Sequence, residues 1–460
     1  MGVRSKYYII LLLFVFCLTS CTGEEGGAPI VSEQPLAVSF DSYLTKQQET
    51  RAVYPTGSEK VGELDNTRLK LAEFGVFATH TDNTTYAFDG ATTGQEPFNF
   101  MWNQEVEWGS DHWAYEPLKY WPNDNQPADD QTPPAQGSQE HSYLSFFAYA
   151  PYSDGTDKTA EDEDDDGTPD AEGIVGMSDN GDDSGDSYIT YRNTTWKAWE
   201  SVDLLWSRQT DRYKMDGAGY VDGQVQFNFI HALSKIGINV RTLVDYVDTD
   251  DTDPTYPDEP DSNTKIFIES VQITSPTIYG EANMYLAPNP VSATKPKWGD
   301  FANATPPTIS GDVIHDDLLW GGTPDDHEDV SLTVADFNGM PSGVTSTLHQ
   351  LFSNASSPYF MFIPTTTSQP LTIRVVYYVV TYDPNLKLNN PRYYSIVRND
   401  ISRTAGSITF ESNKVYSLEL YLGLTTVKFN VVGVEDWATP ITLDGVVRDP
   451  ETETHELNVK

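Results

Sequence analysis

The sequence predicts an all-β protein of the sandwich type. Short stretches that alternate between apolar and polar residues recur along the chain, which contains 26 tyrosines and 20 phenylalanines. Aromatic and β-branched residues in such stretches favour strands. Clusters of glycine, proline, asparagine and aspartate separate the stretches, and long segments of helical periodicity are absent from the sequence.

The expected strands are distributed over most of the chain. They span residues 37–44, 69–79, 143–152, 223–240, 264–274, 371–382, 393–400, 414–424 and 426–434. Two segments are the best candidates for helices, residues 194–208 and 345–354.

The N-terminus has the composition of a bacterial lipoprotein signal peptide. Arg4 and Lys6 precede an apolar run over residues 7–16, which is too short to span a membrane comfortably. The run ends in Leu18-Thr19-Ser20-Cys21, the pattern of a lipobox, so cleavage before Cys21 would leave its thiol for lipidation. The alternative is an ordinary secretory cleavage site in which the cysteine occurs by chance.

Charge and cysteine content narrow the compartment and the partners. The chain has two cysteines: Cys17 would leave with the signal peptide and Cys21 would be acylated, so the mature chain could form no internal disulfide. The stretch "TGEEGG" after Cys21 resembles the signal that sends lipoproteins to the outer face of the outer membrane, or it is a plain tether. A formal net charge of −41 excludes nucleic acid as a partner, because phosphate binding needs a basic surface.

Changes in composition predict the domain organisation. Residues 1–20 are the signal peptide and 21–35 the tether, followed by an N-terminal β-sandwich domain over 36–245 that carries an acidic loop insertion. Residues 246–263 form an acidic linker with almost no apolar content. A C-terminal β-sandwich domain covers 264–437, and 438–460 form a C-terminal extension.

The acidic insertion contains a calcium-loop pattern, D-x-D-x-D-G-x-x-D. Its candidate ligands are Asp162, Asp164, Asp166 and Asp170, and alternating carboxylates before a glycine turn suit a hard cation. The twelfth position is Gly173 rather than a bidentate glutamate, and the neighbouring sequence is acidic throughout. The alternative is therefore a solvated acidic loop, and no cofactor is required.

Catalytic motifs are missing from the sequence. It contains no G-x-S-x-G, no H-E-x-x-H, no phosphate-binding glycine loop and no free cysteine that could act as a nucleophile. A pair of carboxylates would suffice for a glycosidase, but among 69 acidic residues such a pair carries no information. We therefore predict a protein that is not an enzyme.

Several motifs in order along the chain resemble the fimbrillin family, the pilin-like lipoproteins of the Bacteroidetes. They are "WAYEPLKYWP" (113–122), "LSFFAYAPY" (144–152), "FIHALSKI" (229–236), "YFMFIPT" (359–365) and "VYSLELYLGLTTVKFNVVGVEDW" (415–437). The resemblance covers nearly the whole mature chain. It implies two tandem transthyretin-like β-sandwich domains and a structural subunit of a surface fimbria that contributes to adhesion.

The resemblance also implies a maturation step. A protease would cut after a basic residue in the loop behind the first strand, that strand would leave, and a strand from another subunit would replace it. Here the provisional strand is 37–44, with Val38 and Phe40 on one face, and the loop is 45–63. The scissile bond would be Arg51–Ala52, with Lys46 and Lys60 as alternative sites.

The replacing strand should come from the C-terminal extension of another subunit. Residues 439–449 alternate in part, with Ile441, Leu443 and Val446 as candidate side chains for the pockets, whereas the last ten residues are too polar. The partners would be other fimbrial subunits in a head-to-tail polymer, the outer membrane through the lipid before maturation, and a host or bacterial surface ligand. The alternative function is an anchored surface lipoprotein that binds a glycan or host ligand without polymerising.

Two prominent features are interpreted as structural. The Trp/Tyr/Pro cluster at 113–122 suits core and turn packing, with a sugar-stacking platform as the alternative. His231 has apolar neighbours in an alternating strand, so we predict a buried histidine with a hydrogen-bond partner rather than a ligand or base.

Overall fold

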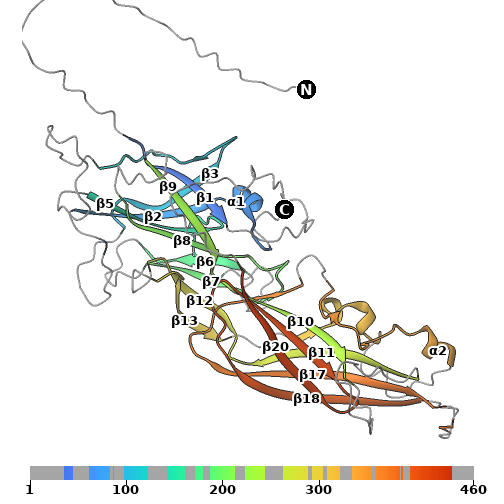
Figure 1. Cartoon of the computed structure of the whole chain (residues 1–460). Helices are drawn as coiled ribbons and strands as arrows, with labels where there is room; N and C mark the ends of the chain where they lie inside the picture. The colour runs from blue at the N-terminus through green and yellow to red at the C-terminus, as the bar shows by residue number, and fades with distance from the viewer. Residues whose placement is uncertain are drawn as a thin grey trace, which may run out of the picture. The chain divides into compact units, whose positions relative to one another are not determined.

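A computed structural model describes most of the chain from Leu36 to Trp437. The described ranges are 36–44, 62–82, 86, 98–122, 142–160, 171–179, 187–212, 223–243, 263–287, 293–303, 308–321, 334–353, 358–383, 385–386 and 394–437. Almost all regular structure in these ranges is strand (Figure 1). None of the helices among the described residues is long and apolar enough to cross a membrane. The predicted all-β, sandwich-like fold is confirmed.

The largest sheet has seven strands in the order β1-β9-β8-β5-β2-β3-β4. Its strands are β1 (Ser39–Leu44), β9 (Gln224–His231), β8 (Leu205–Arg212), β5 (Ser142–Ala150), β2 (Phe74–Asp82), β3 (Met101–Trp108) and β4 (Trp113–Ala114). All neighbours are antiparallel except β1 and β9, which run parallel. Both faces of β5 are buried: Phe146 belongs to one core, and Phe147 to another.

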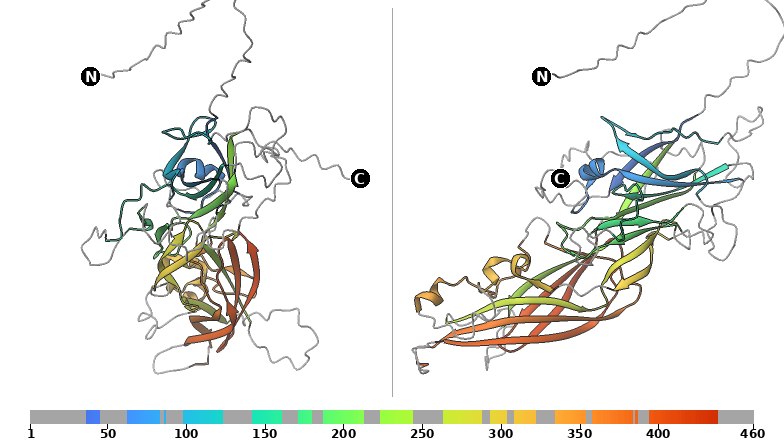
Figure 2. Two further views of the ribbon diagram at one scale, coloured as in Figure 1. Left: turned by 90° about the vertical axis from the view of Figure 1, so that its left-hand side faces the viewer. Right: turned by 180° about the vertical axis from the view of Figure 1, so that it is seen from behind.

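The two faces of this sheet border different cores. On one face lies α1 (Asn66–Ala72) (Figure 2). Its residues Leu69 and Ala72 share a core with Phe74, Phe146 and other sheet residues. On the other face, Trp206 shares a core with a four-stranded sheet of order β13-β12-β7-β6. That sheet consists of β13 (Lys297–Asn303), β12 (Tyr279–Tyr285), β7 (Tyr188–Arg192) and β6 (Gly173–Met177).

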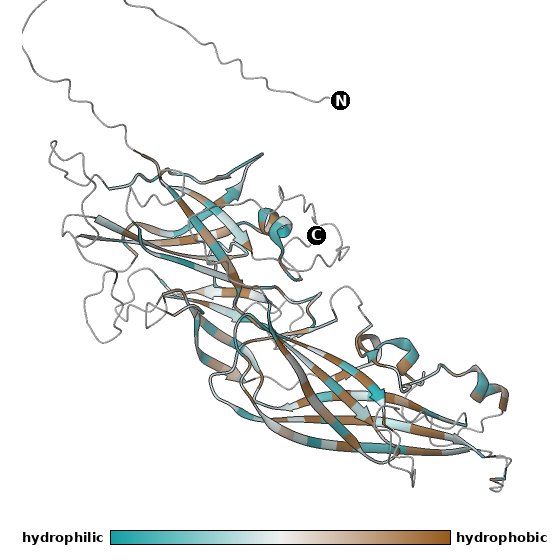
Figure 3. Ribbon diagram, in the orientation of Figure 1, coloured by the Kyte–Doolittle hydropathy of each residue, from teal (hydrophilic) through white to brown (hydrophobic). Residues whose placement is uncertain are grey.

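Two further sheets enclose the largest core. One has the order β15-β10-β19-β20, with β16 also paired to β10, and the other has the order β14-β11-β17-β18. Their strands are β10 (Ser234–Thr242), β15 (His349–Gln350), β16 (Phe360–Phe362), β19 (Lys414–Leu422), β20 (Val427–Asp436), β14 (Thr308–Ser310), β11 (Thr264–Ser275), β17 (Gln369–Tyr382) and β18 (Tyr394–Ile408). Apolar and polar bands follow one another along parts of these strands (Figure 3), and residues 416–422 of β19 alternate between buried and less buried positions.

Short helices lie in the connections between the strands of these two sheets. They are η1 (Gly311–Val313), η2 (Asp316–Leu318) and α2 (Val334–Gly339). Phe337 of α2 is buried with Tyr378 and Tyr394 against the outer face of the β11-β17-β18 sheet.

Strand pairing crosses the predicted domain boundary in both directions. The linker proposed at 246–263 lies outside the described residues except for Asn263. Before it, β10 runs parallel to β19 of the C-terminal part, while β12, after it, pairs with β7 of the N-terminal part. Each of the two predicted parts therefore contributes a strand that pairs with a strand of the other part. The division into domains at 36–245 and 264–437 stays a prediction.

Three local predictions are wrong, and one predicted strand is divided in two. Residues 69–72 are helical rather than strand, because the Asp65 side chain accepts a hydrogen bond from Arg68 N and begins α1 ahead of β2. Residues 194–208 form turns followed by the start of β8, and residues 345–354 form bends around the short β15, wherever the structure describes them. The predicted strand 223–240 is divided into β9 and β10 by a bend at 232–233.

Candidate functional site around the first strand

The first strand occupies one end of the seven-stranded sheet and is bonded on both sides. Its residues pair in parallel with β9, from Ser39 opposite Gln224 to Leu44 opposite Phe229. On the other side Val38 N donates to Lys119 O at 2.9 Å, and an isolated bridge joins Ala37 to Tyr120. β1 therefore fills a slot between β9 and residues 119–121.

Alternation along β1 puts its apolar side chains into the core beneath the sheet. Val38, Phe40 and Leu44 are at most 4% exposed. The Phe40 ring stacks on Phe227 at a centroid distance of 5.6 Å and meets the rings of Phe74, Tyr115 and Phe146 at 6.4, 5.2 and 5.9 Å. The slot thus contains an aromatic pocket that receives one large side chain.

The start of β1 is fixed by two polar contacts from the Trp/Tyr/Pro cluster. The Tyr115 hydroxyl donates to Val38 O at 2.8 Å, and burial raises the pKa of Tyr115, which keeps the hydroxyl protonated as a donor. Trp121 Nε1 donates to Gly223 O at 3.1 Å, and the same carbonyl accepts from Ser39 N at 2.9 Å. Tyr115 thus bonds the chain at the start of β1 directly, whereas Trp121 shares the Gly223 carbonyl with Ser39 of β1.

Gly223 permits the close approach of the chain ahead of β1. Its φ is +81°, and an added Cβ would lie 2.8 Å from Ala37 O and 2.9 Å from Leu36 Cγ. A side chain at this position would therefore push the start of β1 away from β9.

The end of β1 is held by a side chain that replaces a neighbouring strand. Asn66 Oδ1 accepts from Leu44 N at 2.7 Å, and Asn66 Nδ2 donates to Leu44 O at 2.9 Å. Asn66 is the first residue of α1, which fixes its position. The amide satisfies both backbone groups of the last residue of β1.

Replacing Asn66 with alanine should loosen this end of β1. We expect the free energy of unfolding to fall by about 1–2 kcal/mol, and the Leu44 amide hydrogen to exchange faster, because both bonds to the Leu44 backbone are lost. Native-state hydrogen exchange followed by mass spectrometry measures this.

Asn99 provides a matched control, since its side chain makes the same pair of bonds to His80 of β2, at 2.7 and 3.1 Å. Asn99→Ala should leave exchange at Leu44 unchanged. Equal exchange at Leu44 in the two variants would show that Asn66 does not hold β1.

A buried ion pair includes Glu63, the second residue of the described range that begins at residue 62. Lys235 Nζ is 2.6 Å from Glu63 Oε2, and both side chains are at most 7% exposed. Trp437 Nε1 donates to Glu63 Oε1 at 2.7 Å, and Lys235 Nζ lies 4.5 Å from the ring centroids of both Tyr359 and Trp437. We call Glu63, Lys235 and Trp437 the clasp; its members satisfy one another, as buried charges require.

His231 supports the clasp from the end of β9. Its ring stacks on Trp437 at a centroid distance of 3.8 Å, and its Nδ1 lies 2.8 Å from Asp203 Oδ2. The same aspartate oxygen accepts from Leu64 N at 2.9 Å. The prediction that His231 is a buried histidine with a hydrogen-bond partner is confirmed. The clasp therefore joins the chain just beyond residues 45–61 to the root of the C-terminal extension.

The predicted site residues all lie outside the described residues. These are the lipidation residue Cys21, the cleavage pair Arg51 and Ala52, the donor side chains Ile441, Leu443 and Val446, and the calcium ligands Asp162, Asp164, Asp166 and Asp170. Across the part of the chain that the structure describes, no cluster of three or more histidine, cysteine or acidic side chains could hold a metal ion.

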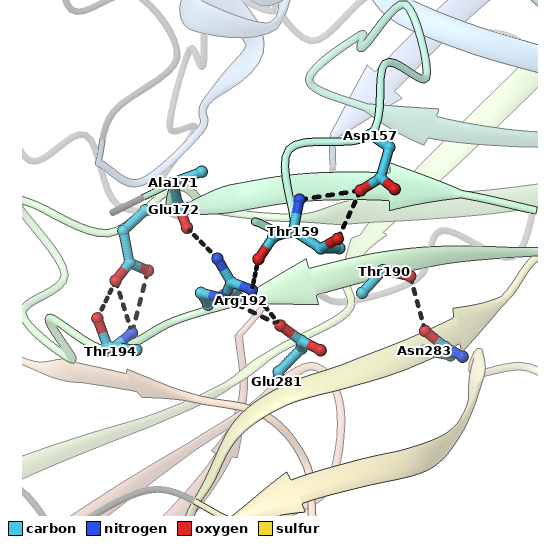
Figure 4. A network of polar contacts seen from close by, with 9 residues as sticks. All are labelled: Asp157, Thr159, Ala171, Glu172, Thr190, Arg192, Thr194, Glu281 and Asn283. Atoms are coloured by element: carbon cyan, nitrogen blue, oxygen red, sulfur yellow. Dashed lines mark hydrogen bonds and ion pairs between the residues drawn. The ribbon is translucent and has the colours of Figure 1, made fainter. Parts of the chain in front are cut away.

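The chain on both sides of the acidic segment is fixed by one arginine (Figure 4). The buried Arg192 donates from Nη2 to Thr159 O at 2.9 Å and from Nη1 to Ala171 O at 3.3 Å. Its guanidinium also pairs with Glu281 Oε2 at 2.7 Å. Thr159 and Ala171, which flank residues 161–170 in the sequence, are thus bonded to the same side chain of β7.

The cluster at 113–122 is core, as predicted. Trp113, Tyr115 and Trp121 are each at most 7% exposed, whereas Tyr120 is 46% exposed. The sequence interpretation did not assign the contacts of Tyr115 and Asn66 with β1. The only local signal for Asn66 was an Asp-Asn pair ahead of an apolar segment, which is typical of a helix start.

Comparisons with known proteins find similarity to fimbrial proteins in sequence and in fold. Residues 138–265 match the family model described as fimbrillin-like. The fimbrium subunit Fim1C of Phocaeicola vulgatus is 25% identical over 234 residues, a match that spans half of this chain and half of that protein. The crystal structure of a fimbrial protein from Bacteroides vulgatus has a similar fold, with a TM-score of 0.51 and 20% identity over 87% of this chain and 99% of that one. The chain is thus similar in sequence to fimbrillin-like proteins over residues 138–265, and its fold is similar to that of a fimbrial protein.

Proposed function

We propose that this chain is a structural subunit of a bacterial surface fimbria that assembles by strand exchange. The proposal begins with export: lipidation at Cys21 holds the chain at the outer membrane, facing outward. A protease then cuts Arg51–Ala52, which separates the lipid and β1 from the body. The freed body joins other subunits and contributes to adhesion to a host or bacterial surface.

The observation that carries this proposal is the way β1 is attached. β1 fills an apolar slot with Val38, Phe40 and Leu44, but it is connected to α1 only through residues 45–65. A cut in that connection leaves β1 held by non-covalent contacts alone. Departure of β1 would expose the backbone edge of β9 and the aromatic pocket, and an open edge beside apolar pockets is a template for another strand.

A slot on one copy and a strand from another form a head-to-tail contact. Such a contact does not close on itself, so it propagates as a filament. Within this proposal the division into domains at 36–245 and 264–437 and the donor role of 438–460 are retained. Calcium at Asp162, Asp164, Asp166 and Asp170 would be an accessory feature, and isothermal titration at millimolar calcium tests it.

The mature N-terminus decides between this function and an anchored surface protein. In the native bacterium, fimbriae from the wild type should begin at Ala52, and Arg51→Ala should leave an uncut, lipidated chain that forms no fimbriae. Lys46→Ala and Lys60→Ala are matched controls that should still be cut at Arg51. A fimbria-associated chain that still begins at Cys21 would refute cleavage and favour an anchored lipoprotein that binds a glycan or host ligand.

A further inference from the structure

The C-terminal extension contains a segment that matches β1 residue type by residue type. β1 and the residue before it read "VSFDSYL" over 38–44, and the extension reads "ITLDGVV" over 441–447. The inward positions Val38, Phe40 and Leu44 correspond to Ile441, Leu443 and Val447, and the small Ser42 corresponds to Gly445. The outward positions agree as well: Ser39 corresponds to Thr442, and Asp41 to Asp444.

We propose that residues 441–447 of a second copy replace β1 in this register, parallel to β9. The inference rests on the proposed function, since β1 must leave first. Leu443 would enter the pocket of Phe40, and Ile441 and Val447 would take the positions of Val38 and Leu44. In this register Val446, like Tyr43, points outward, and Val447 rather than Val446 fills the last pocket.

Other registers bury the wrong side chains. A shift by one residue turns Thr442 and Asp444 inward, and an aspartate against the aromatic pocket would be an unpaired buried charge. A shift by two residues places Gly445 either in the Phe40 pocket or in the Leu44 position, which leaves a cavity. In the antiparallel orientation centred on the same segment, Gly445 again faces the Phe40 pocket.

The backbone contacts of β1 suit any strand in this register. The Tyr115 hydroxyl, which bonds Val38 O at 2.8 Å, would bond the carbonyl of Ile441. The Asn66 amide, which bonds Leu44 N and O at 2.7 and 2.9 Å, would bond the backbone of Val447. These two side chains bond main-chain groups, so they suit a strand that carries other side chains, and the side-chain pockets set the register.

The clasp determines that the strand comes from another copy. Trp437 stacks on His231, which follows the position opposite Leu44 by two residues along β9. Ile441 would have to reach the level of Gly223, eight residues back along β9, or about 26 Å. The four residues from Trp437 to Ile441 span at most about 14 Å. An extension rooted at its own clasp cannot enter its own slot in this direction.

Disulfide trapping tests the register and the partner together. In the register proposed, Thr442 lies opposite Gln224, as Ser39 does in the structure. One full-length chain carries Gln224→Cys and another carries Thr442→Cys; both are cut after Arg51, mixed and oxidised. The native cysteines, Cys17 and Cys21, are removed by the cut. We expect a disulfide-linked pair of chains, and a ladder of linked oligomers when one chain carries both substitutions.

Asn228→Cys is the matched register control. Asn228 lies opposite Tyr43, about 13 Å further along β9 than Gln224, so its bond to Thr442→Cys should be lost. Oligomers that form with a bond to Asn228→Cys, or with no bond to Gln224→Cys, would overturn the register but leave strand exchange standing. A bond within one chain carrying both substitutions would overturn the role of the second copy.

Whether β1 leaves the cut protein shows which of the two ideas is wrong when no oligomer forms, the proposed register or strand exchange itself. Size-exclusion chromatography and mass spectrometry of the cut protein show whether residues 1–51 stay with the body. If they stay and no oligomer forms, strand exchange is wrong and the register is wrong with it. If they leave, Leu443→Asp should abolish oligomers, and Leu443→Phe should preserve them and slow their dissociation, because the pocket holds a phenylalanine in β1.

Discussion

Replacing Phe40 with alanine should lower the free energy of unfolding of the uncut chain by about 3–5 kcal/mol. The side chain is 4% exposed and contacts the rings of Phe74, Tyr115, Phe146 and Phe227, so truncation leaves a cavity among rigid aromatic walls. Denaturation in urea, followed by circular dichroism, measures the change. The variant should also release β1 faster after a cut at Arg51.

Leu118 offers a control of the same chemical kind. It is 53% exposed, and Leu118→Ala should change the free energy of unfolding by less than about 0.5 kcal/mol. In assembled fimbriae Phe40→Ala should have no effect on stability, because β1 has left. A destabilisation that persists in the fimbriae would mean that β1 remains in its slot, against the proposed exchange.

Removing one partner of the clasp should have an effect of similar size. Glu63→Gln leaves the Lys235 ammonium buried without its counter-charge, and we expect a cost of about 3–5 kcal/mol. Lys235→Met leaves the Glu63 carboxylate buried in the same way. The double variant removes both charges, so its cost should be well below the sum of the two single costs. Urea denaturation of the four proteins gives the coupling energy directly.

The exposed pair Lys197–Glu200 is the matched control for the clasp. Its atoms are 2.9 Å apart, yet its side chains are 28% and 45% exposed, so Glu200→Gln should cost less than about 1 kcal/mol. Additive costs at Glu63 and Lys235 would show that the two charges do not depend on each other.

The strands were predictable from sequence where their alternation was strong. The regions of β5, β11, β17 and β19 were all expected, because both local propensity and apolar pattern favour a strand there. The strand prediction for residues 69–72 was wrong because their apolar residues fit both the helical and the strand period. The capping contact between Asp65 and Arg68 favours the helix. The helix prediction for residues 194–208 was wrong because their alanine and leucine residues favour a helix locally, whereas the structure places Trp206 in the strand β8, where it is buried.

Only the local pattern of the candidate site, the alternation of residues along β1, was predictable from the sequence. Alternation around Phe40 indicated an inward face, and the structure places Val38 and Phe40 in the core. The contacts that fix β1 come from residues far away in sequence: Asn66 lies 22 residues from Leu44, and Tyr115 lies 77 residues from Val38. Glu63 and Trp437 of the clasp are 374 residues apart. No local pattern signals such pairs, because each residue alone has the composition of an ordinary loop or core position.

The parallel pairing of β1 with β9 has a consequence for the order of folding. Ser39 and Gly223, which are bonded at the start of this pair, are separated by 184 residues, so β1 cannot find its place until β9 has been made and has joined its own sheet. Closing so long a loop is slow compared with forming the antiparallel neighbours. During biogenesis we therefore expect the slot beside β9 to form before β1 can occupy it.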